Sequence, residues 1–290
     1  HSIVFCKNSK IEIISKSIAS INSDKNVLFV YDGKIDKKIV SDIFYELKLS
    51  GCKVVKVECA AEKLNKNEKL LFRILDVLLA NNFTRRSIII SLGGGVIGDV
   101  SALASSLYLR GLNYIFIPTT MTAIVDSSIG GKTAINYKGI TNSVGTYYHP
   151  KNVYISKTII NYLPNREYIS GIPEIIKCGL IDKSNLLNLL KKKSKIIERD
   201  FLFLTKIIKD TLISKIKFFK NDVKEKNYRL MLNFGHTFAH AIESSLDKNL
   251  KNKKEILRHG EAVGLGLLCE IYYKNGKDKN YYLIKDLLNL

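Results

Sequence analysis

The sequence predicts an α/β fold in which a domain with a parallel β-sheet is followed by an all-α domain. Short apolar segments alternate with amphipathic ones up to about residue 157, and a glycine-rich turn at 91–99 joins a strand to a helix. Beyond residue 157 the strand-like segments give way to helical periodicity. We therefore expect two domains, residues 1–160 and residues 161–290.

The first domain is predicted from its alternating segments. The apolar segment 26–32 is followed by an amphipathic helix at 39–51, which Gly51 closes. The next segments are a strand at 52–58, a helix at 67–82, a buried strand at 87–92, a helix through 101–109 and a strand at 113–118. Strands and helices that alternate at this spacing are typical of a parallel sheet with helices on both faces.

The second domain is predicted from helical periodicity alone. Leu163 and Pro164 precede it, and proline is favoured where a helix begins. Apolar residues then recur at helical spacing in 172–181, 185–197, 201–219 and 229–244. No strand is expected in this half of the chain.

Composition limits the partners of the protein. The 290-residue chain has a formal net charge of +19, but eight of its 46 basic residues are arginine and the lysines are spread along it. Nucleic-acid sites usually group arginine or aromatic residues, so we interpret the lysines as solvated surface and expect no nucleic-acid partner. No apolar run reaches the ~18 residues that span a bilayer, so no membrane partner is expected. Five cysteines without a CxxC pair indicate reduced thiols and a cytoplasmic location.

The segment SLGGGVIGD contains Gly93, Gly95 and Gly98 in the spacing G-x-G-x-x-G. Glycines at these positions let backbone N–H groups approach a pyrophosphate at a helix N-terminus, although a tight turn can use the same residues. No acidic residue ends the following strand, as one would in an ordinary Rossmann unit. The acidic residue at a strand end is Asp32, upstream, so the sequence predicts a rearranged nucleotide site.

The segment DSSIGGKT (126–133) ends like a phosphate-binding P-loop. A true P-loop needs a glycine five residues before Gly131, and Asp126 stands there. We therefore exclude ATP or GTP hydrolysis. Two interpretations of Lys132 remain: the double-glycine turn directs it at an anion, or it is an ordinary turn residue.

The helical half contains the residues of a catalytic metal site. His236 and His240 lie four apart, as in a zinc-peptidase helix, but Thr237 stands where a peptidase has glutamate. Glu174, His236 and His259 together supply the three protein ligands of a catalytic zinc site with an open position. Read singly, Glu174 would be half of a surface ion pair and His259 a helix cap.

Several cationic residues accompany this set, namely Lys132, Lys177, Lys215 and Arg229. They are more numerous than a peptidase site needs. Such a pocket suits an anionic, phosphorylated polyol or ketose.

Eight motifs occur together along the chain: GGGVIGD, YLRG, PTT, DSSIGGKT, LPNRE, PEIIK, LNFGHTFAHAIE and HGEAV. The order and approximate spacing of these motifs resemble those of 3-dehydroquinate synthases, and the resemblance covers nearly the whole chain. That family belongs to the sugar-phosphate cyclases and is distantly similar to glycerol and iron-type alcohol dehydrogenases. The resemblance implies a dinucleotide-binding α/β domain, a helical metal-binding domain, an active site in the cleft between them and a homodimer.

The resemblance also implies a reaction of the shikimate pathway, which leads to aromatic amino acids. The sugar phosphate 3-deoxy-D-arabino-heptulosonate 7-phosphate would be converted to 3-dehydroquinate and phosphate. Such a lyase uses NAD catalytically: an alcohol is oxidised, phosphate is eliminated, the ketone is reduced and the opened ring closes by an aldol step. A divalent metal, zinc or cobalt, polarises the alcohol.

Carried over residue by residue, the resemblance implies three groups of site residues. The metal ligands would be Glu174, His236 and His259. The catalytic and substrate-binding residues would be Arg110 (from a neighbouring subunit), Asp126, Lys132, Asn142, Lys177, Lys215, Glu225, Arg229, Asn233 and His240. The cofactor contacts would be Asp32, Lys63, Gly94, Gly95, Val96, Ile97, Gly98, Asp99, Thr119, Thr120 and Lys132.

The chain departs from the family pattern mainly at the cofactor. Thr141 stands where a basic contact is usual, Tyr162 replaces a threonine, and the E-x-x-K loop is blurred in ECAAEK (58–63), where Lys63 is the candidate. The resemblance also implies a lysine-bearing stretch beyond Leu290, so we expect the second domain to be incomplete. The alternatives are another sugar-phosphate cyclase, a metal-dependent polyol dehydrogenase and a non-catalytic binding protein.

Overall fold

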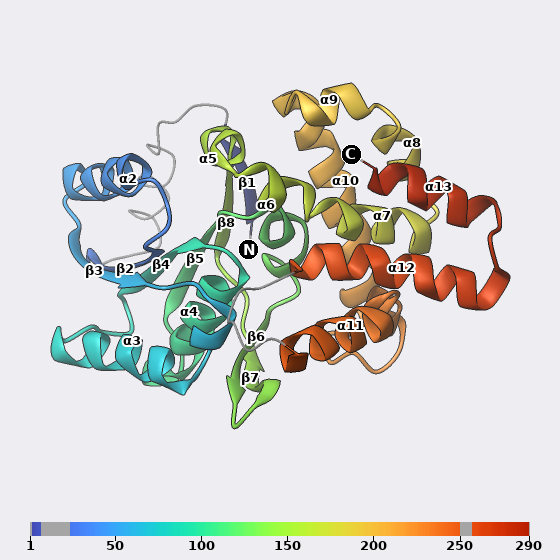
Figure 1. The fold of residues 1–290 in the computed structure, drawn as a ribbon. Coiled ribbons are helices and arrows are strands. Elements are labelled where there is room, and N and C mark those ends of the chain that lie inside the picture. The colour runs from blue at the N-terminus through green and yellow to red at the C-terminus, as the bar shows by residue number, and fades with distance from the viewer. Residues whose placement is uncertain (1, 7–23, 250–256, 290) are drawn as a thin grey trace. The chain divides into compact units, whose positions relative to one another are not determined.

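The computed structural model describes residues 2–6, 24–249 and 257–289, and the chain divides into two compact units, 1–162 and 163–290. Figure 1 shows the helices and strands of both units. Among the described residues, no helix combines the length and the apolar character that crossing a bilayer requires.

The first unit contains a six-stranded sheet, a two-stranded hairpin and the helices that cover the sheet. Its elements are β1 (Ser2–Cys6), β2 (Asn26–Asp32), α2 (Lys37–Leu49), β3 (Lys53–Cys59), η1 (Lys63–Asn65), α3 (Glu68–Ala80), β4 (Ile88–Gly93), α4 (Gly95–Leu107), η2 (Tyr108–Arg110), β5 (Asn113–Pro118), η3 (Ala123–Ser127), β6 (Lys132–Tyr137), β7 (Ile140–Tyr147), β8 (Asn152–Ser156) and α5 (Lys157–Tyr162).

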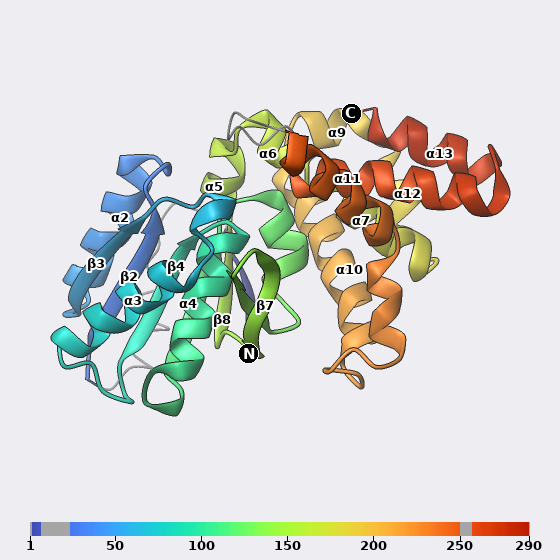
Figure 2. The same ribbon diagram turned by 60° about the horizontal axis from the view of Figure 1, so that its bottom comes forward.

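All neighbouring strands of the large sheet are parallel, in the order β1-β8-β5-β4-β2-β3. Helix α2 packs on one face together with Ile159 of α5, while α3 and α4 pack on the other face (Figures 1 and 2). Because both faces are covered, β4 is buried along its whole length, and this explains its continuous apolar sequence. The hairpin of β6 and β7 is antiparallel and separate from this sheet.

The strand order places a topological switch at the carboxyl edge of the sheet. Strand β2 lies between β3 and β4, so the chain passes first to one side of β2 and then to the other. Ligands of open α/β sheets bind outside the carboxyl ends of the strands at such a point. Strand β2 ends at Asp32 and β4 at Gly93, so Asp32 comes to lie beside the glycine-rich segment.

The second unit is helical throughout its described residues, 163–249 and 257–289. Its elements are α6 (Asn165–Ile169), α7 (Ile172–Ile181), α8 (Leu186–Leu190), α9 (Lys193–Ile197), α10 (Phe201–Phe219), η4 (Tyr228–Asn233), α11 (His236–Asn249), α12 (His259–Asn275) and α13 (Lys279–Leu288). Helix α7 is buried from Ile172 to Gly179, and α8, α10, α12 and α13 pack against it. The predicted fold class, a parallel-sheet α/β domain followed by a helical domain, is confirmed.

Candidate metal centre and substrate site

Glu174 is a buried carboxylate in the first turn of α7, directly after Pro173. Its side chain has no exposed surface, and its Oε2 lies 2.5 Å from the Nζ of Lys177, one turn further along the helix. Within the described residues no hydrogen-bond donor satisfies Oε1. A buried carboxylate oxygen without a donor is costly unless a cation binds to it.

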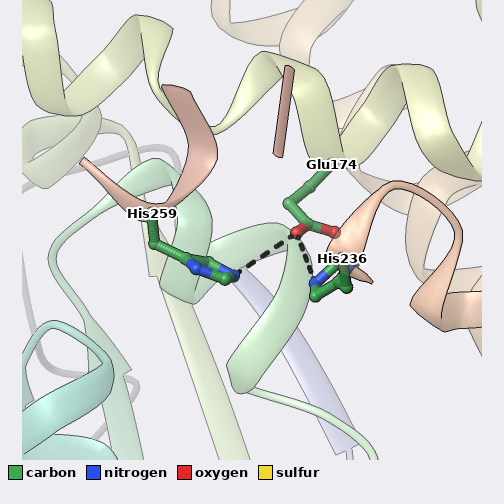
Figure 3. Close-up of side chains that lie close together, drawn as sticks. All are labelled: Glu174, His236 and His259. Carbon is green, nitrogen blue, oxygen red and sulfur yellow. Dashed lines mark ion pairs between the residues drawn. The ribbon is translucent and has the colours of Figure 1, made fainter. Parts of the chain in front are cut away.

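Two imidazoles face this oxygen, as Figure 3 shows. The Nε2 of His236 is 3.6 Å from Glu174 Oε1, and the Nε2 of His259 is 3.9 Å from it. The other ring nitrogen of each histidine is near an acceptor: Nδ1 of His236 is 3.3 Å from the carbonyl oxygen of Phe234, and Nδ1 of His259 is 3.4 Å from Glu243 Oε1. This arrangement directs both Nε2 atoms towards Glu174 Oε1, as expected for ligands of one metal.

The backbone around the histidines is fixed by close packing. His236 begins α11 and His259 begins α12. The N–H of Gly235, which has φ +81°, donates to the carboxylate of Glu270 on α12. A Cβ on Gly266 would lie 2.0 Å from the carbonyl oxygen of Gly235, so α11 and α12 approach each other more closely than a side chain allows.

The three side chains fit a divalent cation. One ligand atom from each of Glu174, His236 and His259 lies within 4.8 Å of the others. One carboxylate and two imidazoles form a usual ligand set of catalytic zinc, which keeps a further position for substrate. His240 stands beside the set, with its ring centroid 5.6 Å from that of His236 and 6.2 Å from that of His259, but it is not one of the three.

Three predicted substrate-binding cations are buried in this unit. Lys177, Lys215 and Arg229 are 1%, 5% and 4% exposed, respectively. Lys215 follows Ser214, whose hydroxyl donates to the carbonyl of Cys178 at 3.5 Å, so α10 holds this region against α7. Buried cations need anionic or dipolar partners, and Lys177 has one in the carboxylate of Glu174.

Arg229 is placed by a loop that Asp222 organises. The carboxylate of Asp222 accepts the backbone N–H groups of Lys226, Asn227 and Arg229 at 2.8, 2.7 and 3.0 Å. These hydrogen bonds, that of Lys226 first, lower the pKa of Asp222. The guanidinium of Arg229 in turn donates to the carbonyl of Val223 at 2.8 Å.

Two more predicted residues are joined to each other next to this loop. Asn233, at the end of η4, donates to Glu225 Oε1 at 2.9 Å. Glu225 has a positive φ of 57°, a conformation that L residues seldom adopt and that is often found at functional sites.

The predicted cofactor residues gather at the carboxyl edge of the sheet in the first unit. The N–H of Thr119, which follows β5, donates to the carbonyl of Gly93 at 2.8 Å. A Cβ on Gly94 would come 3.0 Å from Thr120 Cγ2, and one on Gly98 would come 2.6 Å from the ring of Phe116. These glycines therefore permit the close packing of helix on strand that nucleotide-binding turns need. Gly95, Val96 and Ile97 form the first turn of α4.

Sequence analysis missed Lys66 in this region. Its ammonium contacts the carboxylate of Asp99, and it donates to Asn142 Oδ1 at 2.5 Å. Burial raises the pKa of Asp99, while the charge of Lys66 opposes that rise. Lys63 lies in η1, but its side chain is outside the described part. Lys66 directly precedes the N-cap Asn67 of α3, and nothing in the lysine-rich sequence distinguishes it from the other lysines.

Asp126 and Lys132 flank the double-glycine turn. Asp126 lies in η3, a single π-helical turn of a type often found at functional sites. Gly130 and Gly131 have φ values of 89° and 69°, and a Cβ on Gly131 would lie 2.7 Å from the ring of His149. The turn requires glycine and leads directly to the exposed Lys132 at the start of β6.

Arg110 lies away from these residues. It ends η2, before β5 begins at Asn113, and Leu109 and Arg110 both have positive φ values of 49° and 66°. The 13-residue helix α4 separates it from the glycine-rich turn by about 20 Å. Arg110 is therefore at the amino edge of the sheet, opposite the cofactor residues of its own unit.

A cavity of about 300 Å³ is also present in the second unit. Its lining is mostly apolar and includes Ile172, Pro173, Leu265 and Leu288. None of the three metal-ligand candidates lines it, so we do not assign the chemistry to it.

Comparison with solved structures identifies the fold. The chain superposes on 2-epi-5-epi-valiolone synthase from Streptomyces hygroscopicus subsp. jinggangensis, solved with NAD+ and Zn2+, with a TM-score of 0.85 and 23% identity, over 99% of this chain and 79% of that one. It also superposes on 2-deoxy-scyllo-inosose synthase in complex with carbaglucose-6-phosphate, NAD+ and Co2+, with a TM-score of 0.82 and 22% identity, over 99% and 78%. The fold is that of cyclases of this type.

Sequence comparisons then identify the family. Models described as 3-dehydroquinate synthase N-terminal and C-terminal match residues 56–170 and 171–285. The 3-dehydroquinate synthase of Dictyoglomus thermophilum is 40% identical over 91% of this chain and 72% of its own length, and that of Francisella tularensis subsp. holarctica is 44% identical over 72% and 57%. The chain belongs to the 3-dehydroquinate synthase family. The predicted family, and with it the predicted class of enzyme, is confirmed, although the chain spans only 57% to 72% of these two relatives.

Proposed function

We propose that this protein converts 3-deoxy-D-arabino-heptulosonate 7-phosphate to 3-dehydroquinate and phosphate. The observation that carries the proposal is the buried Glu174 carboxylate, whose Oε1 faces the Nε2 atoms of His236 and His259. Membership of the family supports the reaction. Structural relatives named as holding NAD+ with Zn2+ or Co2+ support the choice of both cofactors.

The residues of the chain would bind and orient the substrate. A divalent cation, zinc or cobalt, at the three ligands would polarise the substrate alcohol, and NAD would take up and return its hydride. The groups proposed to hold the substrate hydroxyls and carboxylate are Asp126, Lys177 and Lys215. Those proposed to surround the phosphate are Lys132, Asn142, Arg229, Asn233 and His240. Glu225 holds the amide of Asn233 through their hydrogen bond.

The proposed cofactor site is the carboxyl edge of the sheet. The pyrophosphate would lie at the first turn of α4, where missing side chains expose backbone N–H groups, and Asp32 would contact a ribose. Lys66 joins the proposed contacts because its ammonium touches Asp99.

We also propose a homodimer in the cytoplasm. Arg110 lies at the amino edge of the sheet in a strained backbone conformation. A contact between Arg110 and the substrate site of a second subunit would give this strain a function. All five cysteines lie in the part of the chain that the structure describes. None of them forms a disulfide there and four are buried, which supports a reducing compartment.

A single incubation tests the proposed reaction. The purified protein is mixed with zinc, substoichiometric NAD and the heptulosonate phosphate, and phosphate and dehydroquinate are measured. Many turnovers per NAD are expected, because the cofactor is regenerated in each cycle. Absence of product would refute the proposal, and NADH formation equal to turnover would indicate a polyol dehydrogenase instead.

A further inference from the structure

We propose that two arginine–glutamate pairs between α6 and the start of α12 position His259 for metal binding; the inference rests on the metal site proposed above. The Nε and NH2 atoms of Arg166 lie 2.6 and 2.7 Å from the two carboxylate oxygens of Glu261. The Nε of Arg258 lies 2.7 Å from Glu167 Oε1. We refer to these contacts as the α6–α12 ion pairs.

The ion pairs connect two of the three segments that carry proposed metal ligands. Arg166 and Glu167 lie on α6, and the chain continues directly into α7, which carries Glu174. On the other side, Arg258 and Glu261 flank His259. The pairs therefore connect the segment of the carboxylate ligand to the segment of an imidazole ligand.

The first turn of α12 depends on such outside contacts. The first four N–H groups of a helix have no acceptor within the helix, so its first residue is the least restrained by helical hydrogen bonds. His259 is that residue. Glu261 Oε2 accepts the N–H of Arg258 at 2.9 Å, so one carboxylate both caps α12 and binds α6.

The backbones also meet at this place. A Cβ on Gly260 would lie only 1.5 Å from the carbonyl oxygen of Ser170, which stands between α6 and α7. The ion pairs thus surround a direct backbone contact beside His259. Metal sites tolerate ligand displacements of about 0.2 Å, so a small slip at this contact changes metal affinity.

The ion pairs are partly exposed, so a role in positioning His259 can be distinguished from a role in the stability of the fold. The side chains of Arg166 and Glu261 are 48% and 28% exposed, and those of Arg258 and Glu167 are 35% and 23% exposed. Ion pairs that water reaches in this way contribute little to global stability. The effect of breaking them should therefore appear in metal binding. The bidentate geometry of Arg166 supplies the directional restraint that a single point charge lacks.

The test changes only α6. In the double variant Arg166→Gln/Glu167→Gln both pairs are lost while α12 keeps its sequence. Zinc affinity of the metal-free full chain is measured by competition with a chromophoric chelator, and its unfolding is measured in urea. We expect zinc binding about tenfold or more weaker, as for loss of other contacts that orient ligands, with an unfolding midpoint close to wild type.

Two further variants sharpen the comparison. Lys193→Gln breaks another ion pair of the second unit, 3.0 Å between Lys193 and Asp286, and should leave zinc affinity unchanged. Arg166→Lys keeps the charge but not the two parallel hydrogen bonds, so its zinc affinity should fall between those of wild type and the double variant.

The outcomes separate this inference from the proposed function. Wild-type protein that binds no zinc, or zinc binding that survives His259→Ala, overturns the metal site and the inference with it. Tight wild-type binding that the double variant retains overturns the positioning role alone. So does an affinity loss fully explained by unfolding of the metal-free double variant.

Discussion

Replacing Gly266 by alanine is expected to remove tight metal binding from a protein that still folds. The new Cβ would lie 2.0 Å from the carbonyl oxygen of Gly235, whereas a carbon–oxygen contact between packed helices needs ~3.3 Å. Helices α11 and α12 must therefore separate by about 1.3 Å at this point. Gly235 directly precedes His236, and α12 begins at His259, so the change displaces two of the three ligands.

The size of the displacement determines the expected effect. Metal–ligand distances are held within about 0.2 Å, so a shift several times larger should weaken zinc binding by ~100-fold or more. Overpacking of this kind costs about 1–3 kcal/mol of folding free energy, against a typical total of about 5–15 kcal/mol. The metal-free variant should therefore remain folded.

Gly264→Ala on the same helix is the matched control. Its Cβ would meet Leu288 Cδ2 at 3.0 Å and Pro173 Cγ at 3.2 Å, and the leucine side chain can move aside. Chelator competition should give near wild-type zinc affinity for this control and a large loss for Gly266→Ala, with urea unfolding to confirm that both fold. Wild-type affinity in Gly266→Ala would refute the reasoning, because the close approach of α11 and α12 would then not set the ligand positions.

Three further predictions concern single carboxylates. In urea titrations at a zinc concentration of 100 times Kd, the free energy of unfolding of the wild-type protein should rise by about 2.7 kcal/mol. The free energy of unfolding of Glu174→Gln should not rise. An equal rise in this variant would exclude Glu174 as a ligand. Glu243→Gln should weaken zinc binding ~10–100-fold in the chelator assay, because Glu243 Oε1 lies 3.4 Å from His259 Nδ1 and would orient the imidazole. Unchanged zinc affinity would show that Glu243 does not orient His259. Backbone N–H groups lower the pKa of Asp222 below its ordinary 3.8, so its ionised form stabilises the fold above that pH and the contribution is lost as pH falls through the lowered pKa. Asp222→Asn should thus lower the urea midpoint at pH 7, with a difference from wild type that shrinks as the pH falls below 3.8. A constant difference would count against the ionised carboxylate.

The elements that the sequence predicts well are those whose burial follows from local pattern. Strand β4 is apolar throughout because helices cover both of its faces, and the structure has it within one residue of the predicted bounds. Strand β1 has five residues, and its partner β8 lies about 150 positions away, so no local signal indicates the pairing. Strand β7 is exposed over its whole length and therefore lacks the apolar alternation by which strands are recognised.

The residues of the candidate site also form two groups, those that the sequence indicates and those that it does not. Glu174, His236 and His259 could be selected from sequence because their side chains carry the chemistry of a metal site. The residues that support a site could not, because their roles depend on contacts between distant segments. Lys66 is 33 positions from Asp99, and Glu270 is 35 positions from Gly235. A lysine in a lysine-rich chain, or a glutamate in a helix, has no distinguishing neighbour in the sequence.

The two oxygens of Glu174 have different partners at the proposed metal site. Lys177 occupies Oε2, and Oε1 faces the two imidazoles, so one buried carboxylate is shared between an ammonium group and the metal position. Because this carboxylate is the single anion among the ligands, a divalent cation there keeps a net positive charge, and the ammonium of Lys177 adds to it. Such a pocket favours an anionic substrate oxygen. A peptidase needs a base beside its first histidine to activate water, and proposed phosphate elimination from an anionic sugar does not, which is consistent with Thr237 in that position.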